Sequence, residues 1–492
     1  MKLLVVGLDC AAPELLFGDE RLQNFRRLMD AGCYGRLESV IPPITIPAWR
    51  CMVTSQDPGS LGVYGFRNRA DHSYGKLDIV NSRSFKALTI WDHLALEGKK
   101  SVIIGVPPSL PPPRVNGIAV GCFMTPTVED AYTHPPQVAA EIRDLVGEYL
   151  VDVKGFRTDD KDWLRDQIFE MSRKQFTVVR HYMEKAEWDY FHFVNIALDR
   201  VHHGFWKYMD PRHPDYEPGS PYEHVISDFY LHLDQELGTL LELVDDDTAV
   251  LVVSDHGAQA LHGGFCVNEW LVKEGLLVLE EYPKEVTPFG KLEVDWAKTR
   301  VWSEGGYYAR VFFNVKGREP NGVVEAADYE RFRDEMKAKF EALTDEHGVR
   351  LGGDKGTLVY KPEEIYQHVR NVAPDLVVHF GSLDWRSIGG VGYEGRLHVK
   401  ENDTGPDDCN HAQFGAFILA AANVPSLGEL QGARLLDIAP TLMEVGGYEV
   451  PESFQGRSLF AGSLGEARGV GAVSAEGEEI IRQRLSGLGY IS

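Results

Sequence analysis

Four predicted strand ends in this chain carry an aspartate, a histidine or both. They are Asp9, Asp199, Asp255 with His256, and His411, which comes just before a predicted strand. In an open parallel sheet, ligands bind beyond the carboxyl ends of the strands, so these side chains can converge. Carboxylates and imidazoles together are typical ligands of Zn²⁺, Mn²⁺ or Fe. The pattern therefore indicates a metal site.

Asp199 is followed by His202 and His203, of which only one needs to face the site. Three aspartates and three histidines are enough for two ions with three protein ligands each. Two ions held about 3.5–4 Å apart can act on both the attacking and the leaving oxygen of a displacement at phosphorus. Such a reaction also needs a nucleophile.

Thr45 is the candidate nucleophile, in the stretch IPPITIPAWRCMVTS at residues 41–55. A free hydroxyl is a poor nucleophile at neutral pH unless a metal or a base activates it. Taken alone, the stretch favours a turn residue in a proline-rich loop over a nucleophile. An aspartate after a strand is also more often a helix N-cap than a metal ligand.

The elements that must position these residues alternate between strands and helices. Most predicted strands are continuous apolar runs, which is typical of parallel strands buried on both faces. They cover 2–9, 100–107, 189–199, 248–257, 374–381 and 415–421. Predicted helices lie at 24–32, 160–186, 227–244 and 329–348. This alternation predicts an α/β fold with a doubly wound, mostly parallel sheet and inserted cap segments.

The chain divides into a core and insertions. We expect residues 1–265 and 366–460 to form the catalytic core, and 266–365 to form an inserted cap. The proline-rich region 107–165 is a possible second insertion, and residues 461–492 are expected to dock on the core as a tail. We expect the residues that determine substrate specificity to lie in these insertions. The candidates that could face the site are 305–308 and Arg318.

Composition narrows the class of protein. The 492 residues carry a formal net charge of −24, which argues against binding of nucleic-acid polymers. The six cysteines are scattered, without a C-x-x-C pair, which favours reduced thiols in an intracellular chain. The first apolar run is too short for a signal peptide and no run is long enough to span a membrane, so we expect a cytoplasmic location.

The motifs taken together resemble the alkaline phosphatase superfamily, in its type I phosphodiesterase/nucleotide pyrophosphatase branch. VVGLDCAAPELL resembles the first metal-ligand strand of that family, and TIPAWRCMVTSQDPGSLGVYGF its nucleophile segment. DRVHHG, SDHG and NHAQFGAFILAA are similar to its later ligand motifs, and 435–459 to a widespread C-terminal stretch. Within it, the chain resembles a subgroup described as predicted phosphohydrolases or phosphomutases.

The resemblance implies a role for each matching residue. Asp199, His203 and His411 would hold one ion, and Asp9, Asp255, His256 and the Thr45 oxygen the other. Zn²⁺ is the expected metal, with Mn²⁺ as the alternative. The implied reaction is attack of Thr45 on phosphorus, which gives a phospho-threonine that water then hydrolyses.

Residues near these motifs are candidates for binding the substrate. Arg50, Arg200 and His202 could hold a phosphate, and Trp49 could stack on a base or sugar or simply pack in a wall. The expected partner is a small phosphorylated molecule. Its identity, and the oligomeric state, are open.

Three other functions remain in view. A phosphomonoesterase or a metal-dependent phosphomutase would share the chemistry up to the phospho-enzyme. A catalytically silent binding protein is disfavoured because the ligand set is complete. A sulfatase is disfavoured because CMVTS after Cys51 lacks the C-x-P-x-R pattern. The glycines at 390, 392 and 395 do not link a strand to a helix, so we expect a loop there and not a dinucleotide-binding site.

Overall fold

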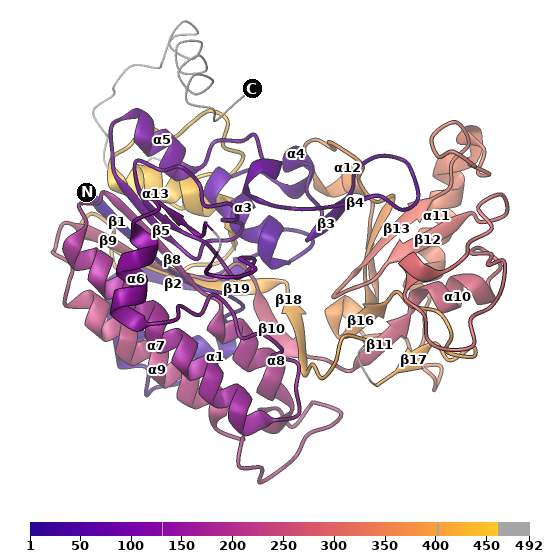
Figure 1. Cartoon of the computed structure of the whole chain (residues 1–492), viewed down its shortest axis with the longest axis horizontal. Helices are drawn as coiled ribbons and strands as arrows, with labels where there is room; N and C mark the ends of the chain where they lie inside the picture. Colours follow the sequence, from indigo (N-terminus) through magenta and orange to yellow (C-terminus); the bar gives the residue numbers. More distant parts are fainter. Residues whose placement is uncertain (130, 401–402, 461–492) are drawn as a thin grey trace, which may run out of the picture.

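A ten-stranded sheet dominates the computed structural model, which describes residues 1–129, 131–400 and 403–460 (Figure 1). Its order is β20-β2-β19-β9-β1-β8-β5-β6-β7, with β21 beside β2. The strands are β1 (Lys2–Leu8), β2 (Cys33–Glu38), β5 (Ser101–Ile104), β6 (Gly117–Val120), β7 (Thr133–His134), β8 (Tyr190–Asn195), β9 (Thr248–Val253), β19 (Phe414–Ala420), β20 (Gly428–Glu429) and β21 (Ala433–Arg434).

The centre of this sheet is parallel. Strand β1 lies between β8 and β9, parallel to both, and β5 continues the parallel order to β6. Strand β19 is antiparallel to its neighbours β9 and β2. The predicted α/β fold with a mostly parallel sheet is therefore confirmed. Strands β8 and β9 are buried along their whole length, as their continuous apolar runs indicate.

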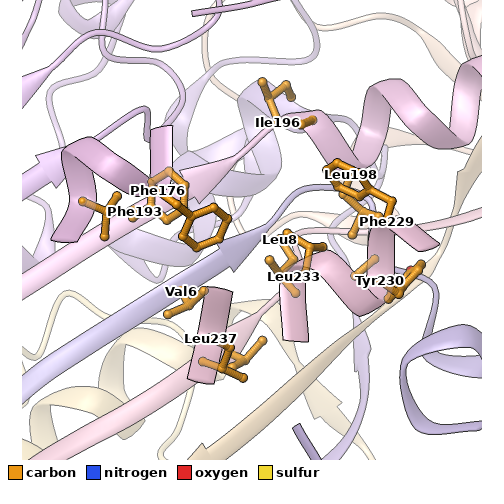
Figure 2. Packing of buried hydrophobic residues seen from close by; sticks show 14 of the residues in the cluster. Val6, Leu8, Phe176, Phe193, Ile196, Leu198, Phe229, Tyr230, Leu233 and Leu237 are labelled. Atoms are coloured by element: carbon orange, nitrogen blue, oxygen red, sulfur yellow. The ribbon is translucent and has the colours of Figure 1, made fainter. Parts of the chain in front are cut away.

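Helices cover both faces of the sheet. One face packs against helices whose apolar sides share a single core, part of which Figure 2 shows. They are α1 (Pro13–Gly18), α2 (Gln23–Ala31), α6 (Val138–Val146), α7 (Lys161–Lys185), α8 (Ala197–Met209) and α9 (Val225–Leu241). The other face packs against α3 (Thr45–Thr54), α5 (Ile90–Leu96) and α13 (Ile438–Gly446). No helix in the described ranges is long and apolar enough to cross a bilayer.

A smaller region lies beside this body, at the right of Figure 1. It contains a four-stranded antiparallel sheet in the order β12-β13-β15-β14 and a three-stranded sheet in the order β16-β11-β17. The strands are β11 (Gly263–Cys266), β12 (Val301–Glu304), β13 (Ala309–Phe313), β14 (Leu358–Tyr360), β15 (Leu376–His379), β16 (Trp385–Ile388) and β17 (His398–Val399). Its helices are α10 (Val267–Lys273), α11 (Tyr329–Glu341) and α12 (Pro362–Ile365).

One strand assignment differs from the sequence-based expectation. The run at 374–381 is β15, which pairs with β13 and β14 instead of a strand of the large sheet. Its side chains join the separate apolar core of the smaller region. The prediction was wrong because a continuous apolar run looks the same in the sequence whichever sheet the strand joins. We therefore take residues 263–399, called the inserted region below, as the proposed boundaries of the cap.

The proline-rich segment 107–165 belongs partly to the core. It supplies β6 and β7 to the edge of the large sheet and α6 to one face. The predicted docking tail at 461–492 lies outside the described residues.

The inserted region is fastened to the core by a short hairpin, β3 (Arg67–Arg69) and β4 (Leu77–Ile79). The Arg69 guanidinium lies 5.0 Å from the ring centres of both Trp302 and Phe312, and 3.2 Å from a carboxylate oxygen of Glu319. Because Arg69 and Glu319 are both buried, this hairpin gives the inserted region a fixed docking point on the core.

Candidate metal and phosphoryl-transfer site

The sequence-predicted site residues converge beyond the carboxyl ends of the central strands. Asp9 directly follows β1, and Asp255 and His256 follow β9. Asp199 and His203 lie one turn apart on α8, which starts just after β8. His411 lies on β18 (Cys409–Ala412), which pairs with β10 (Gly257–Ala260), and Thr45 is the first residue of α3. All seven side chains are buried.

Asp199, His203 and His411, called the first group below, surround one point. Asp199 Oδ1 lies 3.3 Å from His203 Nε2 and 3.7 Å from His411 Nε2. The three ligand atoms all lie within 4.8 Å of one another. One carboxylate and two imidazoles in this arrangement can hold a single divalent ion and leave it an open position.

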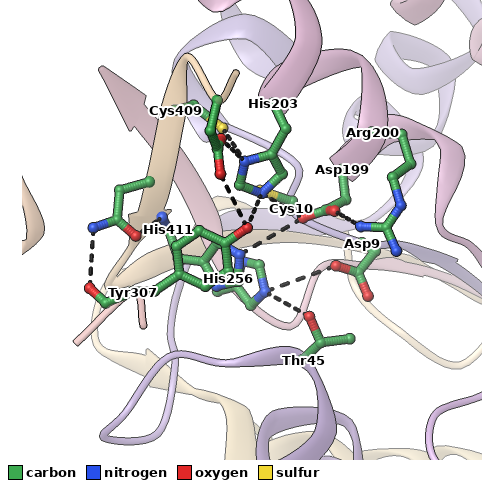
Figure 3. Close-up of polar contacts among 12 residues, drawn as sticks. Asp9, Cys10, Thr45, Asp199, Arg200, His203, His256, Tyr307, Cys409 and His411 are labelled. Carbon is green, nitrogen blue, oxygen red and sulfur yellow. Dashed lines mark hydrogen bonds and ion pairs between the residues drawn. The ribbon is translucent and has the colours of Figure 1, made fainter. Parts of the chain in front are cut away.

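Asp9, Asp255 and His256, called the second group below, form a similar cluster that includes Thr45. His256 Nε2 lies 3.2 Å from Asp255 Oδ2, 3.7 Å from Asp9 Oδ1 and 3.3 Å from Thr45 Oγ1. The threonine hydroxyl thus points at the same place as the ligand atoms, as Figure 3 shows.

The two groups touch each other. The rings of His256 and His411 are stacked, with centres 3.8 Å apart. Two ions held by these groups would therefore be close neighbours, with Thr45 beside the second group.

The donor atoms fit cations. Three carboxylate oxygens that face the two groups have no hydrogen-bond partner among the described residues: Asp9 Oδ1, Asp199 Oδ1 and Asp255 Oδ2. Burial, together with repulsion from Asp199, raises the pKa of Asp9 well above its usual range, and burial with repulsion from Asp9 does the same to the pKa of Asp255. Buried anions this close together need a compensating positive charge, which divalent ions would supply.

Hydrogen bonds also orient two of the candidate histidine ligands for metal coordination. His411 Nδ1 lies 2.9 Å from the Pro43 carbonyl oxygen and His256 Nδ1 lies 3.1 Å from the Gly257 carbonyl oxygen. A proton on each Nδ1 leaves the Nε2 lone pair free to bind a metal. Burial lowers the pKa of His256 to about 4, which keeps its ring neutral.

Asp407 is a site residue that the sequence analysis did not find. Its Oδ1 lies 2.5 Å from His203 Nδ1, on the side of the ring opposite to the first group. Although burial opposes charge on the ring, the Asp407 carboxylate raises the pKa of His203 well above its usual range. The only hint in the sequence was its place four residues before His411, which is no ligand spacing.

Two residues of the inserted region also reach the site. Tyr307 stacks on His411, with ring centres 4.4 Å apart, and Arg386 Nη1 lies 3.1 Å from Asp407 Oδ2. Arg157, from the segment before α7, donates to Tyr307 at 2.6 Å and to Asp407 at 3.0 Å. The expectation that 305–308 faces the site agrees with this position of Tyr307, whereas Arg318 binds Asp375, within the inserted region.

Trp49 lies at the site in a different role from the one considered. Its ring is fully buried, and its indole N–H donates to Asp9 Oδ2 at 2.7 Å, so it has no open face for a base or sugar. Gly7 permits this approach, because a Cβ there would lie 2.7 Å from the Trp49 ring. Of the two alternatives, wall packing is the one this geometry favours, with an added contact to a candidate ligand.

Two further candidates for substrate binding point elsewhere. The Arg50 side chain donates to the Ala87 carbonyl oxygen at 3.1 Å and lies over the Phe85 ring, away from both groups. His202 is fully buried beside Trp206 and Tyr230. In each case the helix turns the side chain into the packed interior.

Arg200 remains beside the site. It pairs with Asp199 Oδ2, and its Nε and Nη2 hold both oxygens of Asp152 at 2.8 and 2.9 Å. Figure 3 shows its guanidinium close to Asp199 and Asp9. Arg200 thus adds positive charge at the edge of the two groups.

A family model for type I phosphodiesterase / nucleotide pyrophosphatase matches residues 3–407. The chain belongs to this family. The match spans all of the candidate ligands except His411 and covers the nucleophile segment. No curated protein matches the sequence. Membership indicates phosphoester hydrolysis as the class of reaction.

Solved structures share the fold. Murine ectonucleotide pyrophosphatase / phosphodiesterase 5 is 15% identical over 92% of this chain and 96% of its own, with a TM-score of 0.51. Phosphonoacetate hydrolase from Sinorhizobium meliloti 1021, in complex with phosphonoacetate, is 16% identical over 90% and 95%, with a TM-score of 0.59. At this identity the similarity shows that the chain shares their fold, and no more.

Proposed function

We propose that this protein is a two-metal phosphohydrolase that acts through a covalent phospho-threonine at Thr45. The observation that carries the proposal is the position of Thr45 Oγ1, 3.3 Å from His256 Nε2 and beside two touching groups of candidate ligands. The first group would hold one divalent ion and the second group the other. Zn²⁺ suits these nitrogen and oxygen donors, and Mn²⁺ is the alternative.

The residues of the chain have distinct tasks in this reaction. Thr45 Oγ1 attacks phosphorus as the alkoxide, its bond to phosphorus forms as the bond to the leaving oxygen breaks, and water later cleaves the threonine ester to release phosphate. Bound ions would lower the pKa of the hydroxyl and offset the charge of the phosphoryl group. The amino end of α3, at Thr45, adds a favourable partial positive charge for an anion.

Rigidity at Thr45 supports an in-line attack. Thr45 is buried at the first position of α3, and Pro47 lies in the first turn, where a missing N–H costs nothing. A nucleophile fixed in this way loses little entropy on reaction.

The substrate we propose is a small phosphorylated molecule in the cytoplasm. Arg200 is the proposed phosphate contact, because its guanidinium lies beside Asp199 at the edge of the groups. The net charge of −24 favours small anions bound at metals over polymeric nucleic acid.

The test is a screen of phosphate monoesters, diesters and pyrophosphates with Zn²⁺ and with Mn²⁺. Rapid acid quenching and mass spectrometry of the peptide around Thr45 should detect a phosphoryl group in the wild type and none in Thr45→Ala. Full activity of Thr45→Ala would refute the covalent mechanism. Product formed in oxygen-18 water should carry the label in its phosphate, whereas a phosphomutase would leave it unlabelled.

A further inference from the structure

We propose that Tyr307 is a substrate-contacting residue of this site, and that its hydroxyl donates a hydrogen bond to a substrate oxygen at the first group. This inference rests on the proposed function, and it assigns part of the reaction site to the inserted region. Tyr307 belongs to the turn between β12 and β13, which reaches from the inserted region to the site.

The ring of Tyr307 is held firmly. It stacks on His411 with ring centres 4.4 Å apart, and the Arg386 guanidinium lies over it at 4.9 Å from the ring centre. The Asn410 side chain also donates to the Tyr307 backbone carbonyl at 3.1 Å. These contacts fix the direction of the phenol.

The hydroxyl oxygen lies where a reacting group would be. It is 3.4 Å from His203 Nε2, the atom of His203 that faces the first group. It accepts a hydrogen bond of 2.6 Å from Arg157 Nη2, which fixes the oxygen and leaves its own proton to be donated.

Both acceptors near that proton are weak. The distance to Asp407 Oδ2 is 3.4 Å, and this oxygen already accepts from Arg157 at 3.0 Å and from Arg386 at 3.1 Å. His203 Nε2, also at 3.4 Å, would have no lone pair to offer once it binds a cation. The proton is then available to an oxygen of the substrate.

Tyr308 shows what a structural tyrosine looks like in the same turn. Its hydroxyl donates to the Tyr64 carbonyl oxygen in a buried contact, and its ring packs with Ile44 and Val377. It touches neither group of ligands. The two neighbours therefore provide a matched pair, one directed at the site and one at the packing between the core and the inserted region.

The experiment compares Tyr307→Phe with Tyr308→Phe. Each protein is assayed on aryl phosphates with leaving groups of different pKa, and binding of inorganic phosphate and metal content are measured by calorimetry and elemental analysis. We expect Tyr307→Phe to lower kcat/KM and phosphate affinity by about tenfold, as for the loss of one hydrogen bond to a charged group. Tyr308→Phe should change both by no more than about twofold, and both variants should keep the wild-type metal content.

The outcomes separate the two proposals. Unchanged phosphate affinity and kcat/KM in a metal-loaded Tyr307→Phe, with an active wild type, would overturn the assignment of Tyr307 alone. A wild type that binds metal but neither binds phosphate nor releases it from any substrate would overturn the proposed function as well.

Discussion

The two groups of candidate ligands resemble each other in composition but differ in how they are held. Every close contact of the second group comes from the core: the Trp49 indole on Asp9, the Cys10 backbone N–H on Asp255 at 3.3 Å, and the Gly257 carbonyl on His256. In the first group, His203 depends on Asp407. Arg157 and Arg386, which come from outside the core sheet, bind that carboxylate in turn.

This difference suggests a division of labour. The second group and Thr45 form a preorganised unit within the core. The first group is coupled to segments whose sequence can vary without disturbing the central strands. In the proposed reaction, changes in the inserted region would then alter the surroundings of the first group and leave Thr45 in place.

The largest expected effect is the loss of a direct ligand. Asp199→Ala and Asp9→Ala should each lower kcat/KM on the order of 10³-fold, because a missing ion removes several kcal/mol of charge stabilisation. Elemental analysis should show a fall from two ions to one per chain for each variant. If one variant kept two ions and full turnover, its group would not be a metal site. Arg21→Ala, a change at the exposed end of a surface ion pair, is the control.

The sequence indicated that the residues of the second group lie close together, because each of them sits at a strand end or a helix start, where residue type and position can be read together. Thr45, Asp9, Asp255 and His256 are cases of this kind. Asp407 was missed because it reaches the site through tertiary contacts of a loop, which follow no period. For the same reason Tyr307 was named only within the candidate range 305–308. The misplacement of β15 had a similar cause, since an apolar run does not reveal which sheet it joins.

The next largest effect should be on the first group alone. Asp407→Asn removes the charge that holds His203 Nδ1. Loss of such a partner of a metal-bound histidine typically lowers metal affinity 10–100-fold. We expect a loss of about 100-fold at one site and little change at the other, seen as two separated steps in a calorimetric metal titration. Equal weakening of both sites would contradict the independence of the two groups. Asp403→Asn, an exposed neighbour at 3.8 Å from Arg386, is the matched control.

A pH experiment compares the core with the inserted region. Burial lowers the pKa of His192 in β8 and of His379 in β15 to about 3 in each case. The unfolded chain, with a histidine pKa of about 6.5, binds more protons than the folded one below that pH, so stability is full above it and is lost as the pH falls. Protonation of each of these histidines in the unfolded chain should lower the free energy of unfolding by about 2 kcal/mol between about pH 7 and about pH 5.

His379→Phe should remove that share of the acid-induced loss, as measured by urea unfolding at several pH values. The control is the exposed His347→Gln, which removes a histidine without changing the buried core. If the inserted region unfolds with the core, the urea unfolding curve shows a single transition, and His379→Phe shifts its pH dependence. Two transitions, of which only one responds, would show that the docking through Arg69 does not couple the regions.

The smallest expected effect concerns the indole beside Asp9. Trp49→Phe keeps most of the buried ring but removes the N–H that donates to Asp9 Oδ2 at 2.7 Å. Loss of one neutral donor to a charged acceptor should cost about 1.5 kcal/mol, or about tenfold in metal affinity at the second group. Metal affinity at the first group should stay unchanged, which is the reverse of the result expected for Asp407→Asn. The control for ring size is Trp302→Phe, which shortens a buried indole in the inserted region. If Trp302→Phe lost as much metal affinity at the second group as Trp49→Phe, the role of the hydrogen bond would be refuted.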